Sequence, residues 1–87
     1  MEMTQVETTG SMRDLVTFIA QSLVDNPNSV SVDEVSSGQT MVLELHVAKP
    51  DIGKVIGRQG RTAHALRTII NAASAKEKKR AVLEIVE

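Results

Sequence analysis

Residues 55–61 read Val55-Ile56-Gly57-Arg58-Gln59-Gly60-Arg61. Two glycines three positions apart let a backbone turn tightly, adopt positive φ and approach a ligand where a Cβ would intrude. A helix-like pattern follows, and the first N–H groups of a helix are unsatisfied and carry partial positive charge, so they attract an anion. The guanidinium of Arg58 adds a full charge that can fork onto a phosphate. On these residues alone, the stretch fits a phosphate-binding turn and a plain corner between two helices equally well, and the rest of the chain has to decide between them.

Charge is distributed unevenly around this turn. Residues 1–48 hold one base and seven acids, a net charge of -6, whereas residues 49–80 hold nine bases and two acids, a net charge of +7. Glu84 and Glu87 bring the total to -1, so the near-neutral sum hides a basic segment centred on the two glycines. Such asymmetry favours a polyanionic partner over a merely solvated surface.

Length and composition limit the class of protein. The 87 residues make one domain with one modest core, and with Phe18 as the single aromatic residue that core must be aliphatic. There is no cysteine, so disulfides, thiolate metal sites and cysteine nucleophiles are excluded. No apolar run approaches the roughly 18 residues that span a membrane, and no secretory signal pattern is present. These features favour a cytoplasmic protein.

Hydrophobic periodicity predicts six elements in one two-layer α+β domain, with helices on one face of a three-stranded sheet. They are a helix at 12–24, strands at 29–35 and 40–48, a short helix at 52–56, a helix at 61–74 and a strand at 81–86. The first two strands, joined by a four-residue turn, form an antiparallel hairpin. Ser11 is the expected N-cap of the first helix, and Pro27 stops that helix. Residues 1–11 are expected to be a disordered tail, and residues 12–87 to form the domain.

Two helical stripes should face the sheet. The stripe of the first helix comprises Met12, Leu15, Val16, Ile19, Ala20 and Leu23, with Phe18 flanking the core. That of the long helix comprises Thr62, Ala65, Leu66, Ile69 and Ala73, while His64, Arg67, Thr68 and Asn71 point outward.

The order helix–strand–strand–helix–turn–helix–strand, with the glycine turn between the last two helices, resembles the type II (bacterial) KH domain. In that family an aliphatic pair precedes Gly-x-x-Gly, a basic residue stands inside the turn, and a helix follows, as in residues 55–61. The longer run 52–62, continued by Ala65-Leu66-Arg67-Thr68, is similar to the small stand-alone bacterial KhpA family. The resemblance covers about residues 12–87. Ala63 departs from it, because many KH domains have a bulky aliphatic residue there, and this departure leaves base preference open.

The resemblance implies that the turn clamps about four nucleotides of single-stranded RNA. The implied RNA-binding residues are Gly57, Arg58, Gln59 and Gly60 in the clamp, Lys54 and Arg61 beside it, and Ile52, Val55, Ile56 and Ala63 as an apolar floor. The strand at 40–46 is the expected edge strand that offers main-chain groups to the bases. The family further implies a homodimer or a pairing with a second, KhpB-like KH protein. It also implies an RNA chaperone or post-transcriptional regulator linked to cell shape and division.

Other chemistry is not expected. No nucleophile–base–acid set is evident, so the sequence predicts neither enzymatic activity nor a cofactor. His46 and His64 have no cysteine or histidine at ligand spacing, so no metal site is predicted. The alternative function is a protein-interaction module that uses the alanine-rich helix 61–74, with the surface around residues 67–71 as its contact. Single-stranded DNA as the ligand, and an RNA contact from the basic run 76–80, both stay open.

Overall fold

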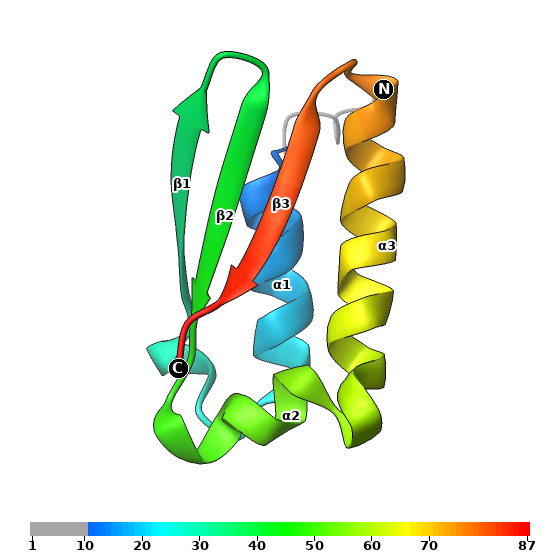
Figure 1. Ribbon diagram of the computed structural model, residues 1–87. Helices are drawn as coiled ribbons and strands as arrows, with labels where there is room; N and C mark the ends of the chain where they lie inside the picture. Colours follow the sequence, from blue (N-terminus) through cyan, green and yellow to red (C-terminus); the bar gives the residue numbers. More distant parts are fainter. Residues whose placement is uncertain (1–10) are drawn as a thin grey trace, which may run out of the picture.

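The computed structural model describes residues 11–87, which fold into two layers (Figure 1). The helices are α1 (Met12–Leu23), α2 (Ile52–Ile56) and α3 (Arg61–Lys76), and the strands are β1 (Ser31–Ser37), β2 (Thr40–His46) and β3 (Arg80–Ile85). All three helices lie on one side of the sheet, so the expected α+β fold of KH type II topology is confirmed. The predicted tail falls almost entirely on residues 1–10, outside the described residues.

The sheet is mixed, with β2 in its centre. β1 pairs antiparallel with β2, and β2 pairs parallel with β3. The hairpin is confirmed, but its loop is shorter than predicted: only Gly38 and Gln39 lie outside the strands, because Ser36 and Ser37 continue the ladder opposite Met41 and Thr40. Gly38 has φ 61°, the positive value that a two-residue hairpin turn needs.

Capping residues set the ends of the helices. The Ser11 side chain accepts a hydrogen bond from the Asp14 N–H at 3.0 Å, which confirms Ser11 as the N-cap of α1. Residues 27–29 form a 3₁₀ turn after α1, and for this reason β1 begins two residues later than predicted. α3 extends to Lys76, beyond its predicted end, and Lys78 follows it with φ 57°.

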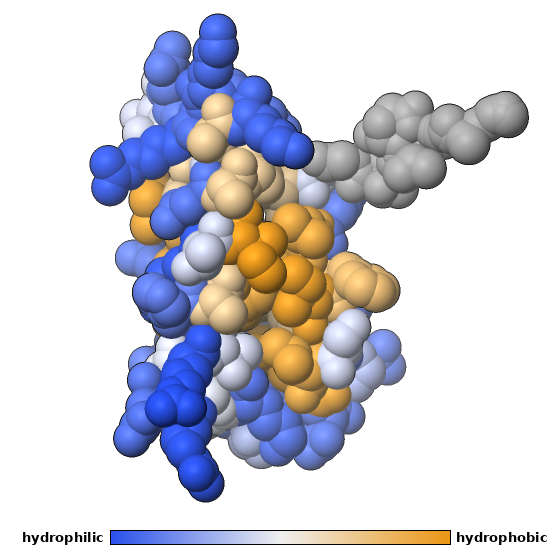
Figure 2. Space-filling model, turned by 90° about the vertical axis from the view of Figure 1, so that its right-hand side faces the viewer, coloured by the Kyte–Doolittle hydropathy of each residue, from blue (hydrophilic) through white to orange (hydrophobic). Residues whose placement is uncertain are grey.

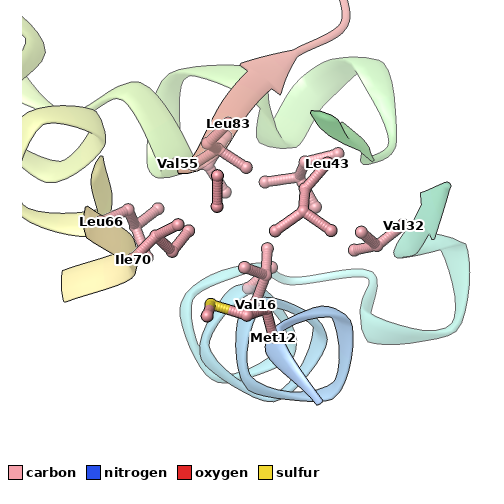
Figure 3. Packing of buried hydrophobic residues seen from close by; sticks show 11 residues of the cluster. Met12, Val16, Val32, Leu43, Val55, Leu66, Ile70 and Leu83 are labelled. Carbon is pink, nitrogen blue, oxygen red and sulfur yellow. The ribbon is translucent and has the colours of Figure 1, made fainter. Parts of the chain in front are cut away.

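The core lies between the helices and the sheet (Figure 3). From the helices it contains Met12, Val16, Ala20, Val55, Leu66 and Ile70, and from the strands Val32, Leu43, Leu45, Ala81 and Leu83. Leu43 and Leu45 are fully buried, as the alternation along β2 predicts. The cluster is aliphatic throughout apart from the thioether of Met12.

Three predictions about buried faces were wrong, and the first concerns Leu23, which was predicted to lie in the buried stripe of the first helix but is 39% exposed at the end of α1. Residues 65 and 69 of α3 are exposed, and its buried positions are Ala63, Leu66, Ile70 and Ser74. The predicted and the observed stripe of α3 both have helical spacing, and only the packing of α3 against β3 and α2 decides which of them is buried. Phe18 is 69% exposed and does not flank the core, because its side chain points almost opposite to the buried stripe of α1.

None of the helices within residues 11–87 is long and apolar enough to cross a membrane.

Candidate nucleic-acid interface

A steric contact requires glycine at the start of the turn. Gly57 ends α2 with φ 78° and ψ 171°, and its N–H donates to Gly53 O at 2.8 Å. A Cβ at this position would lie 2.7 Å from Thr62 Cβ and 2.8 Å from Thr62 N, distances that real Cβ atoms essentially never show. The glycine therefore lets the beginning of α3 fold back tightly against the end of α2.

The rest of the turn presents two unused N–H groups. Gln59 (φ 57°) and Gly60 (φ 74°) both adopt left-handed backbone geometry. The Gly60 N–H donates to Gly57 O at 3.1 Å, and the Arg61 N–H donates to Arg58 O. Among the described residues, the N–H groups of Arg58 and Gln59 donate to no backbone carbonyl. Consecutive free N–H groups in such a turn form a concavity that suits an anion.

The three cations predicted here differ in their surroundings. Arg58 and Arg61 are exposed, and neither takes part in an ion pair within the described residues. Lys54 Nζ instead lies 3.3 Å from Asp25 Oδ2 and 4.0 Å from Asp51 Oδ1. Arg58 and Arg61 are therefore both exposed at the turn, whereas Lys54 lies beside two carboxylates.

Asp51 is a structural element of the site that the sequence analysis missed. It is 1% exposed, and its carboxylate accepts hydrogen bonds from the Asn26 N–H and Asn26 Nδ2, both at 3.0 Å, and from the Asp25 N–H at 3.3 Å. Burial raises the pKa of Asp51, but these hydrogen bonds, together with nearby Lys54, outweigh burial and hold the pKa below its ordinary value. Asp51 thereby ties the segment after α1 to the start of α2, the helix that carries the turn. An acidic residue directly after proline at a helix start was the available signal.

The predicted apolar floor divides into two levels. Val55 is 0% exposed and Ala63 4% exposed, so both support the surface from within the core. Ile52 and Ile56 are partly exposed, so they are the members of this set that a ligand can contact.

The strand predicted to offer main-chain groups to bases is not at an edge. β2 is paired on both sides, so its N–H and C=O groups are occupied by the ladders to β1 and β3. The edge strand that lies beside α3 is β3 (Figure 1). Strand order is set by contacts between segments that are distant in the sequence, so local sequence patterns do not predict it.

The basic run 76–80 lies at the other end of α3. Lys76 ends the helix and Arg80 begins β3, which leaves residues 77–79 as the connection. α3 has 16 residues, which corresponds to about 24 Å along its axis. The run is therefore well separated from the glycine turn.

The two histidines lie on different elements, His46 at the end of β2 and His64 on α3. His64 is exposed on α3. His46 Nε2 lies 3.2 Å from Asp33 Oδ2, and ligand atoms of Asp33, Glu44 and His46 fall within 4.8 Å of one another. These three residues could hold a metal ion, but exposed acidic groups of this kind are common without one, so the prediction of no metal site stays an expectation.

A mixed three-stranded sheet, helices on one of its faces, and a Gly-x-x-Gly turn between α2 and α3 define a KH domain of type II. The family model described as KhpA/KhpB, KH domain, matches residues 13–85. The chain belongs to the KhpA/KhpB KH-domain family, which is not a family of enzymes.

Several relatives carry the name RNA-binding protein KhpA. The one from Clostridium acetobutylicum is 56% identical over 75 residues, and the one from Caldanaerobacter subterraneus subsp. tengcongensis is 53% identical over 75 residues. Each alignment covers 86% of this chain and 100% of the relative. The relative from Aquifex aeolicus is 49% identical over 77 residues, which cover 88% of this chain and 98% of that protein.

A solved structure supports the fold alone. Part of the Aquifex aeolicus protein Era superposes with a TM-score of 0.56 at 19% sequence identity. The match covers 84% of this chain and 28% of Era.

Proposed function

We propose that this protein binds single-stranded RNA through the glycine turn, without catalysing a reaction. The observation that carries this proposal is the turn itself: a sterically required Gly57, two unused N–H groups at residues 58–59, and the exposed Arg58 guanidinium beside them. These groups donate to phosphate oxygens, which every nucleotide supplies. The relatives named RNA-binding protein KhpA support RNA as the ligand.

The contacts at the turn itself indicate weak binding, and they carry little sequence preference of their own. Phe18 is the single aromatic residue of the chain, and it lies on α1 rather than near the turn. Base stacking on aromatic side chains, which strengthens many single-strand binders, is therefore missing. Phosphate contacts release counterions, so the affinity should fall as salt is raised.

The test compares the native protein with the double variant Arg58→Asp/Gln59→Asp, by fluorescence-anisotropy titration of short single-stranded RNA at two salt concentrations. Aspartate tolerates the left-handed backbone of residue 59, so the variant should keep its fold, as circular dichroism would show. We expect at least about a tenfold loss of affinity, because the variant loses the Arg58 guanidinium and places two carboxylates that repel the phosphate beside the main-chain N–H groups.

A matched control separates the turn from net charge. The variant Lys78→Asp/Lys79→Gln changes the charge by the same amount at the far end of α3, and we expect it to bind RNA like the native protein. Equal binding by the native protein and the turn variant would reject the glycine turn as the RNA site. Parallel titrations with single-stranded DNA of the same sequence show whether the protein prefers RNA to DNA.

The cellular role that we propose follows from the resemblance to the KhpA family. We propose that the protein acts in the cytoplasm as an RNA chaperone or post-transcriptional regulator, together with a KhpB-like KH protein, in a process that affects cell shape and division. Loss of the gene should then alter cell dimensions, and the turn variant should fail to restore them.

One observation favours the second candidate function, a protein-interaction module. Figure 2 shows apolar surface gathered between hydrophilic ends of the molecule. The large apolar residues exposed on the two long helices are Phe18 (69%), Leu23 (39%) and Ile69 (45%). Apolar helix surface of this kind suits a second KH domain, either another copy of this chain or a KhpB-like partner. Two joined RNA sites would also raise the effective concentration of each weak site for one RNA.

A further inference from the structure

The free edge of β3 can be assigned from two hydrogen bonds. The Arg80 N–H donates to Gln39 O, and the Val86 N–H donates to Leu45 O, both at 2.9 Å, so the even-numbered residues of β3 direct their main-chain groups toward β2. Successive residues of a strand direct these groups to opposite sides. The N–H and C=O groups of Ala81, Leu83 and Ile85 therefore point away from the sheet, toward solvent and α3.

Arg67 already occupies the middle of this edge. Its side chain reaches across from α3, and its Nε donates to Leu83 O at 3.4 Å. Nε is one of the donors of a guanidinium, so the two terminal amino groups keep their N–H groups available. Arg67 is exposed, so these donors face solvent beside the strand edge.

The position of Arg67 lies within reach of an RNA held by the turn. Arg67 follows Arg61 by six residues, about 9 Å along the axis of α3. α3 leads away from the turn while β3 runs back toward it (Figure 1). Four nucleotides that start at the turn therefore extend past Arg67.

We propose that Arg67 is the specificity-determining residue of this site, and that its terminal amino groups select a base with two adjacent hydrogen-bond acceptors. This inference rests on the RNA-binding function proposed above. Guanine offers O6 and N7, the pair that arginine binds in bidentate fashion, and cytosine offers O2 and N3 on its exposed edge in a single strand. In adenine the N6 amino group lies beside both N1 and N7, and in uracil the N3–H lies between O2 and O4, so neither base offers two adjacent acceptors to the amino groups. The contact with Leu83 O holds the guanidinium in place before a base arrives.

The experiment uses uridine octamers that carry one central guanine, cytosine or adenine, or no substitution, titrated against the full chain. For the native protein we expect guanine or cytosine to bind about tenfold more tightly than adenine or uracil. Arg67→Lys keeps the charge but loses the planar fork, so it should bind the plain uridine octamer within about twofold of the native protein and lose the preference. Arg13→Lys, on α1, is the matched control and should keep the preference.

Base analogues identify the acceptors. If guanine is selected through O6 and N7, 7-deazaguanine should fall to the level of adenine, whereas inosine, which keeps both acceptors, should bind like guanine. The Arg67→Lys variant should bind the 7-deazaguanine octamer and the inosine octamer with equal affinity. Equal binding of all four octamers by the native protein, or an unchanged preference in Arg67→Lys, would overturn the role of Arg67.

The outcome also separates this inference from the function on which it rests. If the turn variant Arg58→Asp/Gln59→Asp loses binding while the native protein shows no base preference, only the role of Arg67 is rejected. If no octamer binds, or if the turn variant binds like the native protein, the proposed function fails and the role of Arg67 fails with it.

Discussion

At the scale of single residues, the three glycines in and beside the turn differ in how strongly the structure requires glycine. Gly57 combines φ 78° with a forbidden Cβ contact, Gly60 has φ 74° with nothing within 4 Å, and Gly53 has neither constraint. We expect Gly57→Ala to lower the free energy of unfolding by at least about 2 kcal/mol, and Gly60→Ala by about 1 kcal/mol. Gly53→Ala, inside α2, should raise it by about 0.5 kcal/mol. Urea unfolding of the three variants gives these values.

The order of the three glycine variants is the critical result. If Gly57→Ala were no more destabilising than Gly60→Ala, the contact with Thr62 would not constrain the turn. RNA affinity measured on the same variants should follow that order, because the angle between α2 and α3 sets the direction of the free N–H groups.

At the scale of elements, Asp51 joins the end of α1 to the beginning of α2. Its pKa is lowered from the ordinary value of 3.8, so its charged form stabilises the folded state, and this stabilisation is present above pH 3.8 and lost as the pH falls through the lower, folded-state pKa. Asp51→Asn should therefore be less stable than the native protein at neutral pH, and the difference should shrink below about pH 4. Urea unfolding across pH 2 to 7 measures it, with the exposed substitution Glu34→Gln as the control. A difference that stays constant down to pH 2 would contradict the role of the charged carboxylate.

Elements that depend on local chemistry could be predicted from the sequence. The Ser11 cap, the alternation of Leu43 and Leu45, and the glycine turn all follow from residues close in the chain, and the order of helices and strands follows from them. The phase of α3 could not be predicted, because two stripes on that helix have equal spacing and packing chooses between them. The same holds for the candidate site: the motif points to Gly57 and Arg58, whereas the place of Arg67 beside the β3 edge depends on strand order.

At the scale of the whole molecule, the polar and apolar surfaces divide along α3. Arg67 faces the edge of β3, and Ile69, two residues later, points about 160° away from it around the helix axis. The proposed RNA site and the proposed protein interface therefore lie on different sides of α3. The two candidate functions are compatible in one molecule, and substitutions on one side should leave the other activity intact.

The separation of the two surfaces predicts how the protein behaves when exposed apolar residues are replaced by polar ones. Phe18→Gln/Ile69→Gln should weaken self-association by at least about tenfold, because each substitution withdraws exposed apolar area from a contact. Folding stability should change by less than about 1 kcal/mol, because neither side chain is in the core. Sedimentation equilibrium over a range of protein concentrations measures association. Val35→Gln, at a position 54% exposed on β1, is the matched control and should leave association unchanged.

If the native protein stays monomeric at every concentration, the same measurement is repeated with a KhpB-like KH protein. Equal association of the native and double-variant proteins would show that the exposed apolar surface of α1 and α3 is not the interface.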